Sequence, residues 1–184
     1  MRLKKLIPAI LVVAFFSTAT FANNTDPKND KEEVKKGGTI VSVAASNENF
    51  TTLVAAVKAA GLVDVLNSDG PFTVFAPVNT AFAKLPEGTV GTLLKPENKK
   101  LLTAILTYHV VAGKFNASDV VKAIKANKGK FVITTVQGGK LTASISNGNV
   151  ILTDVKGNTS KVIITDVKAS NGIIHAIDSV VMPQ

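Results

Sequence analysis

Residues 70–82 have the sequence GPFTVFAPVNTAF, and this stretch decides how the rest of the chain folds. Residues 72–75, FTVF, are aromatic or β-branched, which is typical of a short buried strand, and Pro77 ends that strand. Asn79 follows where its side chain can cap a short helix that carries Phe82 inward. The pattern therefore predicts a buried strand that turns directly into a helix.

A second apolar stretch covers residues 171–183, with the sequence NGIIHAIDSVVMP. An Asn-Gly turn opens it, Asp178 interrupts the apolar run and Pro183 closes it. We expect this stretch and residues 70–82 to lie close together in the core.

The first residues have the three parts of a secretory signal. Basic residues occupy positions 2, 4 and 5, an apolar run covers 6–16, and small residues end at Ala22. The apolar run is shorter than the ~20 residues that span a bilayer. We expect residues 1–22 to be a cleaved signal peptide. There are two alternatives: cleavage after Ala19, and a segment that is retained as an anchor. The mature protein is then exported, either to the periplasm or as a secreted, extracellular protein.

Two further features bound the domain organisation. Residues 23–36 are polar with charges that sum to zero, which predicts a flexible linker, and residues 37–184 have the length of one domain. The chain contains no cysteine, so disulfides and thiolate metal sites are excluded. Stability must come from the core alone.

The charge is positive and is carried by lysine. The chain has a net charge of +8, of which three positive charges lie in residues 1–22, leaving +5 for the mature chain. Arg2 is the only arginine. Lysine lacks the planar fork with which arginine contacts phosphate or guanine, so we expect no nucleic-acid partner. The lysines either attract anionic surfaces or keep the domain soluble.

The sequence pattern at the start of the domain, residues 39–61, predicts a strand followed by a helix. Residues 39–44, TIVSVA, alternate weakly and predict a first strand. Apolar residues at positions 50, 53, 54 and 57 then follow the i, i+3, i+4, i+7 spacing of an amphipathic helix, which Ser46 or Asn49 caps and Gly61 ends.

Two more helices are predicted further along. Pro96 suits the first turn of a helix whose apolar residues 101, 102, 105 and 106 share one face, and this helix gives way to a strand near Tyr108. Ser118 caps a third helix, which Gly129 ends.

From Phe131 onward the pattern changes from helical to alternating, and turns of the Asn-Gly and Gly-Gly type separate the segments. Strands are predicted at residues 131–136, 141–145, 149–153, 161–167 and 173–181. A helical half followed by consecutive strands predicts an α+β domain with an antiparallel sheet.

Three ordered motifs resemble the fasciclin-like (FAS1) domain family. FTVFAPVNTAF and ASNGIIHAIDSVVMP resemble its two signature segments, and LLTAILTYHVVAGK resembles its central Tyr-His segment. The resemblance covers residues 37–183. It implies a wedge-shaped fold of about seven strands with packed helices, in secreted or surface proteins that mediate cell adhesion or contact the extracellular matrix. A single copy behind a signal peptide is similar to the small exported bacterial members.

The same resemblance suggests two candidate binding positions. Tyr108-His109 matches the segment that is implicated in integrin contact in animal relatives, although a tyrosine and a histidine at a helix-strand junction more often pack internally. Asp166-Val167 lies where animal relatives have an Asp-Ile dipeptide, so valine departs from the pattern. We therefore expect no integrin binding and retain these four residues as a surface hypothesis.

Catalytic and metal sites are not indicated. Only two histidines occur, and His175 lies within an apolar strand, which predicts a core histidine. The acidic residues of the domain are scattered, and no G-x-S-x-G, P-loop or dinucleotide motif occurs. We expect no cofactor and no enzymatic activity.

The sequence thus predicts a non-catalytic, exported binding module that contacts a cell-surface or matrix protein. An alternative is the binding of an anionic polysaccharide or envelope polymer through a lysine-rich surface, formed by Lys122, Lys125, Lys128 and Lys130. A third possibility is a stress-induced periplasmic protein without a stable partner. No membrane span is expected after signal cleavage, and the sequence leaves the oligomeric state open.

Overall fold

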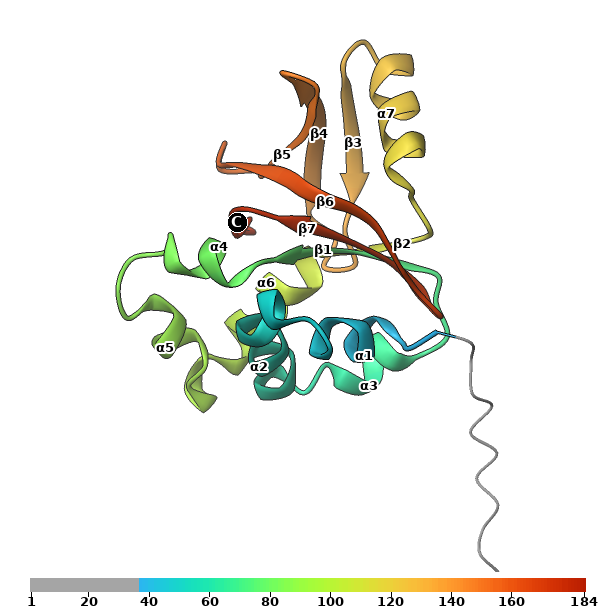
Figure 1. The fold of residues 1–184 in the computed structure, drawn as a ribbon. Coiled ribbons are helices and arrows are strands. Elements are labelled where there is room, and N and C mark those ends of the chain that lie inside the picture. The colour runs from blue at the N-terminus through green and yellow to red at the C-terminus, as the bar shows by residue number, and fades with distance from the viewer. Residues whose placement is uncertain (1–36) are drawn as a thin grey trace, which may run out of the picture. The chain divides into compact units, whose positions relative to one another are not determined.

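A computed structural model describes residues 37–184 of the chain, shown as a ribbon in Figure 1. The expected signal peptide and linker, residues 1–22 and 23–36, lie outside the described residues. The helices are α1 (Ile40–Ala45), α2 (Thr51–Ala60), α3 (Val63–Asn67), α4 (Asn79–Ala83), α5 (Thr89–Leu93), α6 (Lys99–Tyr108) and α7 (Ala117–Ala126), with 3-10 turns η1 (Glu48–Phe50) and η2 (Pro96–Asn98). No helix among residues 37–184 is both long and apolar enough to cross a bilayer.

The strands form one sheet of seven within these residues. They are β1 (Phe72–Pro77), β2 (Val110–Ala112), β3 (Lys130–Thr134), β4 (Lys140–Ser146), β5 (Asn149–Thr153), β6 (Thr159–Ala169) and β7 (Gly172–Ile177). Their order in space is β2-β1-β7-β6-β5-β4-β3. The chain after β3 donates from the Val136 N–H to the Val110 carbonyl of β2 at 2.7 Å, which draws the two edges of the sheet together. The predicted α+β fold with about seven strands is confirmed.

The two apolar stretches, residues 70–82 and 171–183, pair directly. Strand β1 runs parallel to β7, with Phe72 opposite Gly172 and Pro77 opposite Ile177. The expectation that they lie close together is therefore confirmed. The sheet is mixed rather than wholly antiparallel, because this one pair is parallel while the other neighbouring strands pair antiparallel. Hairpin turns in the sequence predict only pairs between consecutive strands, and β1 and β7 are not consecutive.

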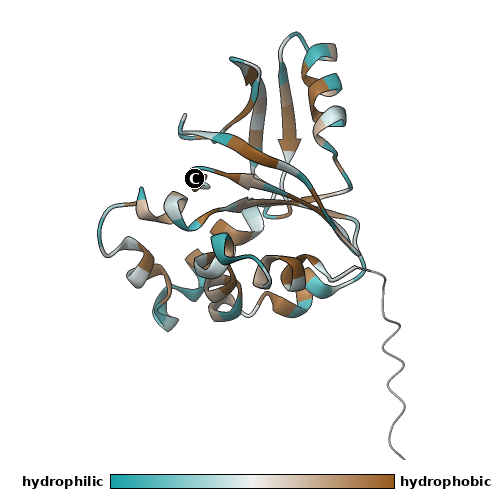
Figure 2. Ribbon diagram, viewed as in Figure 1, coloured by the Kyte–Doolittle hydropathy of each residue, from teal (hydrophilic) through white to brown (hydrophobic). Residues whose placement is uncertain are grey.

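The core has two parts, one on each face of the central strands. One part joins β1 and β7 to helices α1 to α6 and includes Phe50, Leu106 and Ile174. The other part lies between the sheet and α7 and includes Ile124 and Leu141. Figure 1 shows α1 to α6 gathered on one side of β1 and β7, with α7 beside β3. Hydrophobic residues follow β6 and β7 in Figure 2. All of β7 is buried between the two parts, whereas β6 leaves Ile163 and Ile164 exposed.

The predicted first strand, residues 39–44, is wrong, because these residues form helix α1. The Thr39 hydroxyl oxygen caps it by accepting from the Ser42 N–H at 3.3 Å. Ile40 and Ala44, one helical turn apart, are both buried. A segment of six residues can satisfy a strand pattern and a helix pattern at once, and here the burial of one helical face decides.

Three predicted helix caps are also wrong. Asn47, rather than Ser46 or Asn49, caps the turn before α2, since its side chain accepts from the Asn49 N–H at 3.0 Å. Helix α7 begins after Asn116 rather than Ser118. Val78 holds the cap position of α4, and the Asn79 side chain points to α2 instead. Cap residues that lie a few positions apart have similar side chains, so sequence alone places a cap only approximately.

The other elements agree with the sequence analysis. Helices α2, α6 and α7 contain most residues of the predicted helices, while Phe50 and Pro96 lie in the 3-10 turns η1 and η2 that precede α2 and α6. Helix α6 ends at Tyr108, where the strand was expected to follow. Strands β3, β4 and β5 match within two residues at each end. Strand β6 is longer than predicted, and β7 stops at Ile177 because Asp178 begins a polar turn.

Candidate functional site

Tyr108 lies at the junction of α6 and β2, and its side chain is fully buried. Its hydroxyl donates to the Lys140 carbonyl of β4 at 2.7 Å. Burial raises the pKa of Tyr108 above its ordinary value, and the nearby charge of Asp154 acts in the same direction. Tyr108 therefore fastens the end of α6 to the strand hairpins.

His109, the next residue, is buried as well. Its Nδ1 lies 2.8 Å from the Ile105 carbonyl, and its Nε2 accepts from the Val181 N–H at 3.3 Å. Because Nε2 is an acceptor, the ring proton lies on Nδ1 and is donated to Ile105. Burial lowers the pKa of His109 from 6.5 to about 4, so the ring is neutral near pH 7. A neutral ring with both nitrogens in use joins α6 to the segment after β7.

Asp166 and Val167 lie in β6 and are half-buried. The Asp166 carboxylate accepts from the Ala117 N–H at 2.9 Å, so it holds the first turn of α7. Its backbone has a φ of 59°, the left-handed region, at an irregular part of the β6–β7 pairing. Val167 packs against the core beside α1 to α6. The hydrogen bond and the packing give both side chains a structural use.

His175 lies in β7 and is buried, as the sequence predicts. Its Nε2 lies 2.8 Å from the Phe115 carbonyl, and its Nδ1 accepts from the Asp166 N–H at 3.3 Å. The ring stacks on Phe75, with 5.7 Å between the ring centroids. These contacts tie β7 to β6 and to the segment that leads into α7.

The two histidines do not converge on a reactive centre. Phe75 of β1 lies opposite His175 in β7, and its N–H donates to the His109 carbonyl on the other side, so β1 separates the two. All four ring nitrogens contact backbone groups. Within residues 37–184, no group of three or more His, Cys, Asp or Glu side chains is placed to hold a metal ion.

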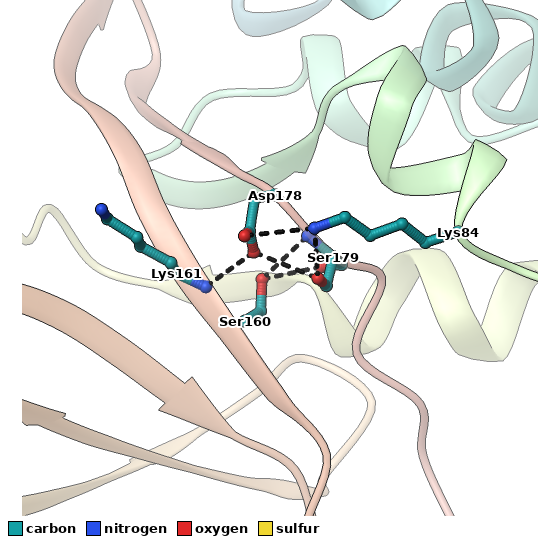
Figure 3. Close-up of polar contacts among 5 residues, drawn as sticks. All are labelled: Lys84, Ser160, Lys161, Asp178 and Ser179. Atoms are coloured by element: carbon teal, nitrogen blue, oxygen red, sulfur yellow. Dashed lines mark hydrogen bonds and ion pairs between the residues drawn. The ribbon is translucent and has the colours of Figure 1, made fainter.

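A polar cluster at the end of β7 brings a lysine, an aspartate and two serines together (Figure 3). Asp178 accepts from the Lys84 ammonium at 3.2 Å, from the Ser179 hydroxyl at 3.1 Å and from the Lys161 N–H at 2.9 Å. The Ser160 hydroxyl donates to the Ser179 carbonyl at 2.8 Å. Burial acts to raise the pKa of Asp178, but the hydrogen bonds lower it below its ordinary value.

The lysine and serine of this cluster lie 3.3 Å apart, from Lys84 Nζ to Ser179 Oγ, which is the distance of a nucleophile and its base. The Ser179 hydroxyl, however, donates to Asp178, and Lys84 donates to the same carboxylate. Each group is thus used in joining α4 and β6 to the end of β7. The arrangement is that of a structural clamp.

Asp154 is a buried carboxylate whose role the sequence analysis missed. It accepts from the N–H groups of Lys156, Asn158 and Met182 at 2.9, 2.9 and 3.0 Å, and from the Asn158 side-chain amide at 2.9 Å. Burial acts to raise its pKa, but these hydrogen bonds together lower it. The contacts within the turn could have been expected from the sequence, because Asp154 precedes Asn158 by four residues and Gly157 lies between them. No feature of the sequence near Asp154 indicates its contact with the Met182 N–H, which lies 28 residues further along the chain.

The four predicted lysines lie on α7, on β3 and in the turn between them, and all four are exposed. Lys122 and Lys125 are three residues apart on α7, whose opposite face buries Val120 and Ile124. Lys128 follows in the turn with a φ of 54°, and Lys130 begins β3. Among the described residues, none of the four lies within ion-pair distance of a carboxylate.

The sequence of this chain is similar to those of known proteins. The Fasciclin domain profile matches residues 48–183. Protein sll1483 of Synechocystis sp. (strain ATCC 27184 / PCC 6803 / Kazusa) is 54% identical over 145 residues, which cover 79% of this chain and 73% of that protein. Immunogenic protein MPB70 of Mycobacterium bovis is 42% identical over 149 residues, covering 78% of this chain and 68% of that protein.

A solved structure shares the fold. The FAS1 domain pair from the insect cell adhesion molecule Fasciclin I superposes with a TM-score of 0.69 at 21% identity, over 77% of this chain and 50% of that one. With the profile match over most of the described residues, the conclusion is that this chain belongs to the fasciclin domain family.

Proposed function

We propose that this protein is an exported, non-catalytic FAS1 binding module that contacts another protein at the cell surface or in the surrounding matrix. The observation that carries the proposal is the fasciclin domain over residues 48–183. A domain pair of the same fold forms part of an insect cell adhesion molecule. The secretory pattern of residues 1–22 supports export.

The proposed contact surface is the outer sheet face, defined by Val132 of β3, Ser144 of β4, Ile151 of β5 and Ile163 of β6. Strand alternation places these residues opposite the buried Leu141 and Leu152. Helix α7 packs on the buried side of β3 and β4 through Val120 and Ile124, so it leaves the outer sheet face uncovered.

Two apolar side chains on this face are large and open. Val132 is 52% exposed and Ile163 is 46% exposed, whereas Ser144 and Ile151 are half-buried. Apolar groups spread over a sheet and surrounded by Thr, Ser and Lys are typical of a surface that a protein partner covers. Tyr108 and His109 have no part in the proposed contact, since both are buried.

The test is capture of partners from envelope and culture fractions by the purified protein, at low and at moderate salt. We expect a specific protein to be retained at moderate salt, because apolar contact is not screened as ion pairs are. The variant Val132→Lys with Ile163→Lys should lose that protein.

The matched control is Val65→Lys with Leu101→Lys, which places two lysines on exposed apolar positions of α3 and α6. This control variant adds the same two positive charges as Val132→Lys with Ile163→Lys, and it should still retain the partner protein. If no protein is retained at moderate salt, or if both variants retain it alike, the outer sheet face is not the contact surface.

A further inference from the structure

The positive charge of the domain is concentrated in one part of the chain. Residues 113–153 contain six lysines and one acidic residue, Asp119, and so carry +5. The rest of residues 37–184 contains eight lysines and eight acidic residues and is neutral. A solubilising charge needs no such separation, since lysines spread over the surface serve equally well.

The structure places this segment at one end of the domain. Residues 113–153 form α7 and strands β3, β4 and β5, and Figure 1 shows α7 and β3 away from helices α1 to α6. All six lysines of the segment are exposed. Asp119 lies one turn before Lys122 in α7, where its carboxylate accepts from the Asn116 side chain at 2.8 Å. The positive field therefore extends from α7 across the turn to β3.

Four exposed lysines follow one another from α7 through the turn into β3, and we call them the lysine band: Lys122, Lys125, Lys128 and Lys130. Lys122 and Lys125 are about 4.5 Å apart along the helix axis. Lys128 lies in the turn, and Lys130 lies in β3 on the side of the exposed Val132, away from the buried Ile133. Because α7 covers the buried side of the sheet, the band passes around the edge from one side to the other.

We propose that the lysine band binds a linear anionic polysaccharide. A flexible chain with an anionic group on successive sugars can follow cations around the edge of a sheet, and each ion pair adds a small gain. A flat anionic bilayer cannot reach both sides of the edge at once. Nucleic acid is disfavoured because residues 37–184 contain no arginine and the nearby Phe131 is half-buried against Phe115.

Polygalacturonate is a suitable probe, with neutral dextran as the control polymer and vesicles of phosphatidylglycerol and phosphatidylcholine as the bilayer. Affinity electrophoresis of the purified protein measures binding to each. We expect retardation by polygalacturonate alone, and its loss at moderate salt. The variant Lys122→Gln, Lys125→Gln, Lys128→Asn, Lys130→Gln should bind about tenfold or more weakly. Asparagine is chosen at position 128 because it tolerates the left-handed backbone there.

The matched control removes four exposed lysines from the neutral part: Lys58→Gln, Lys95→Gln, Lys100→Gln, Lys168→Gln. It has the same net charge and should bind within about twofold of the parent protein. Thermal unfolding checks that both variants are folded, and the double variant Lys125→Gln, Lys128→Asn replaces the quadruple one if that does not fold.

Equal losses in both quadruple variants would show that net charge alone is responsible and would overturn the proposal. So would equal retardation by dextran, or binding to the vesicles without binding to polygalacturonate. Lys130 lies on the same side of β3 as Val132, opposite Ser144 of the outer sheet face. The double variant Lys125→Gln, Lys128→Asn leaves that face unchanged, so it tests the lysine band independently of the protein partner proposed above. Failure of one proposal is thus distinguishable from failure of the other.

Discussion

His109 and His175 are the two histidines of the sequence, and in the structure both are buried and cross-link separate elements. Each ring contacts two backbone groups, one of which is distant in the sequence: Val181 for His109 and Phe115 for His175. A buried polar side chain usually has such partners. His109 joins α6 to the segment after β7, and His175 joins β7 to the chain before α7. The protonation of His109 is therefore coupled to folding.

The stability of the protein should fall on acidification because of His109. Its pKa is lowered from 6.5 to about 4 in the folded state, so the unfolded state binds the proton more readily between these pH values. The contribution is fully present above pH 6.5 and is lost as the pH falls to 4, by up to about 3 kcal/mol. Urea unfolding at pH 7.5, 5.5 and 4.5 measures it.

His109→Gln keeps a donor and an acceptor but cannot titrate, so its free energy of unfolding should change less over this range. The pKa values of Asp119, Asp154 and Asp178 are lowered from the ordinary value of 3.8, so these carboxylates titrate below the same window. A His109→Gln variant that loses as much stability between pH 7.5 and 4.5 as the parent protein would contradict this role.

Helices in this domain are often capped by side chains from other elements. The Asn79 amide oxygen accepts from the Thr52 N–H at 3.0 Å and the Thr51 hydroxyl at 3.1 Å, and its NH₂ group donates to the Glu48 carbonyl at 2.8 Å. Asp166 in β6 likewise holds the first turn of α7 through Ala117. Such caps fix the helices to one another as well as closing their ends.

Asn79→Ala should lower the free energy of unfolding by about 1–2 kcal/mol, because the first turn of α2 loses its partner. Amide hydrogen exchange should show faster exchange at Thr52, with little change in α4, where Asn79 itself lies. Asn49→Ala is the control, since that side chain is exposed and makes no hydrogen bond among the described residues. Equal destabilisation by the two variants would contradict the assignment.

The fold as a unit depends on the parallel pairing of β1 with β7, since the two parts of the core lie on either face of this pair. The pairing is tight where the strands begin. A side chain at Gly172 would clash with the carbonyl oxygen of Phe72 in β1, so only glycine allows this approach.

Gly172→Ala should lower the free energy of unfolding by at least about 2 kcal/mol, because the added methyl group forces the central strands apart. Gly91→Ala is the matched control, as Gly91 lies within α5 with nothing near its Cα hydrogen to obstruct a methyl group. It should stabilise the protein by up to about 1 kcal/mol. Denaturant unfolding of the two variants compares them, and a neutral Gly172→Ala would disprove the tight pairing.

Local patterns predicted much of this fold correctly. The spacing of apolar residues located α2, α6 and α7, and the turn residues located the hairpins between β3, β4, β5 and β6. Residues 39–44 were misassigned because a short segment fits both periodicities. For the candidate site, the sequence indicated that His175 is buried, but it missed the buried Asp154.

Periodicity and turn residues are local properties, and they were enough to indicate the helical and strand-rich halves. The family was indicated by the resemblance of three ordered motifs to the fasciclin domain. The parallel pairing of β1 with β7 and the partners of Asn79, His109, Asp154 and Asp166 were decided only in the folded chain. Most of these partners are backbone N–H and carbonyl groups, which every residue carries except for the N–H of proline. A contact to such a group leaves no mark in the sequence, so it emerges only when packing brings the two segments together.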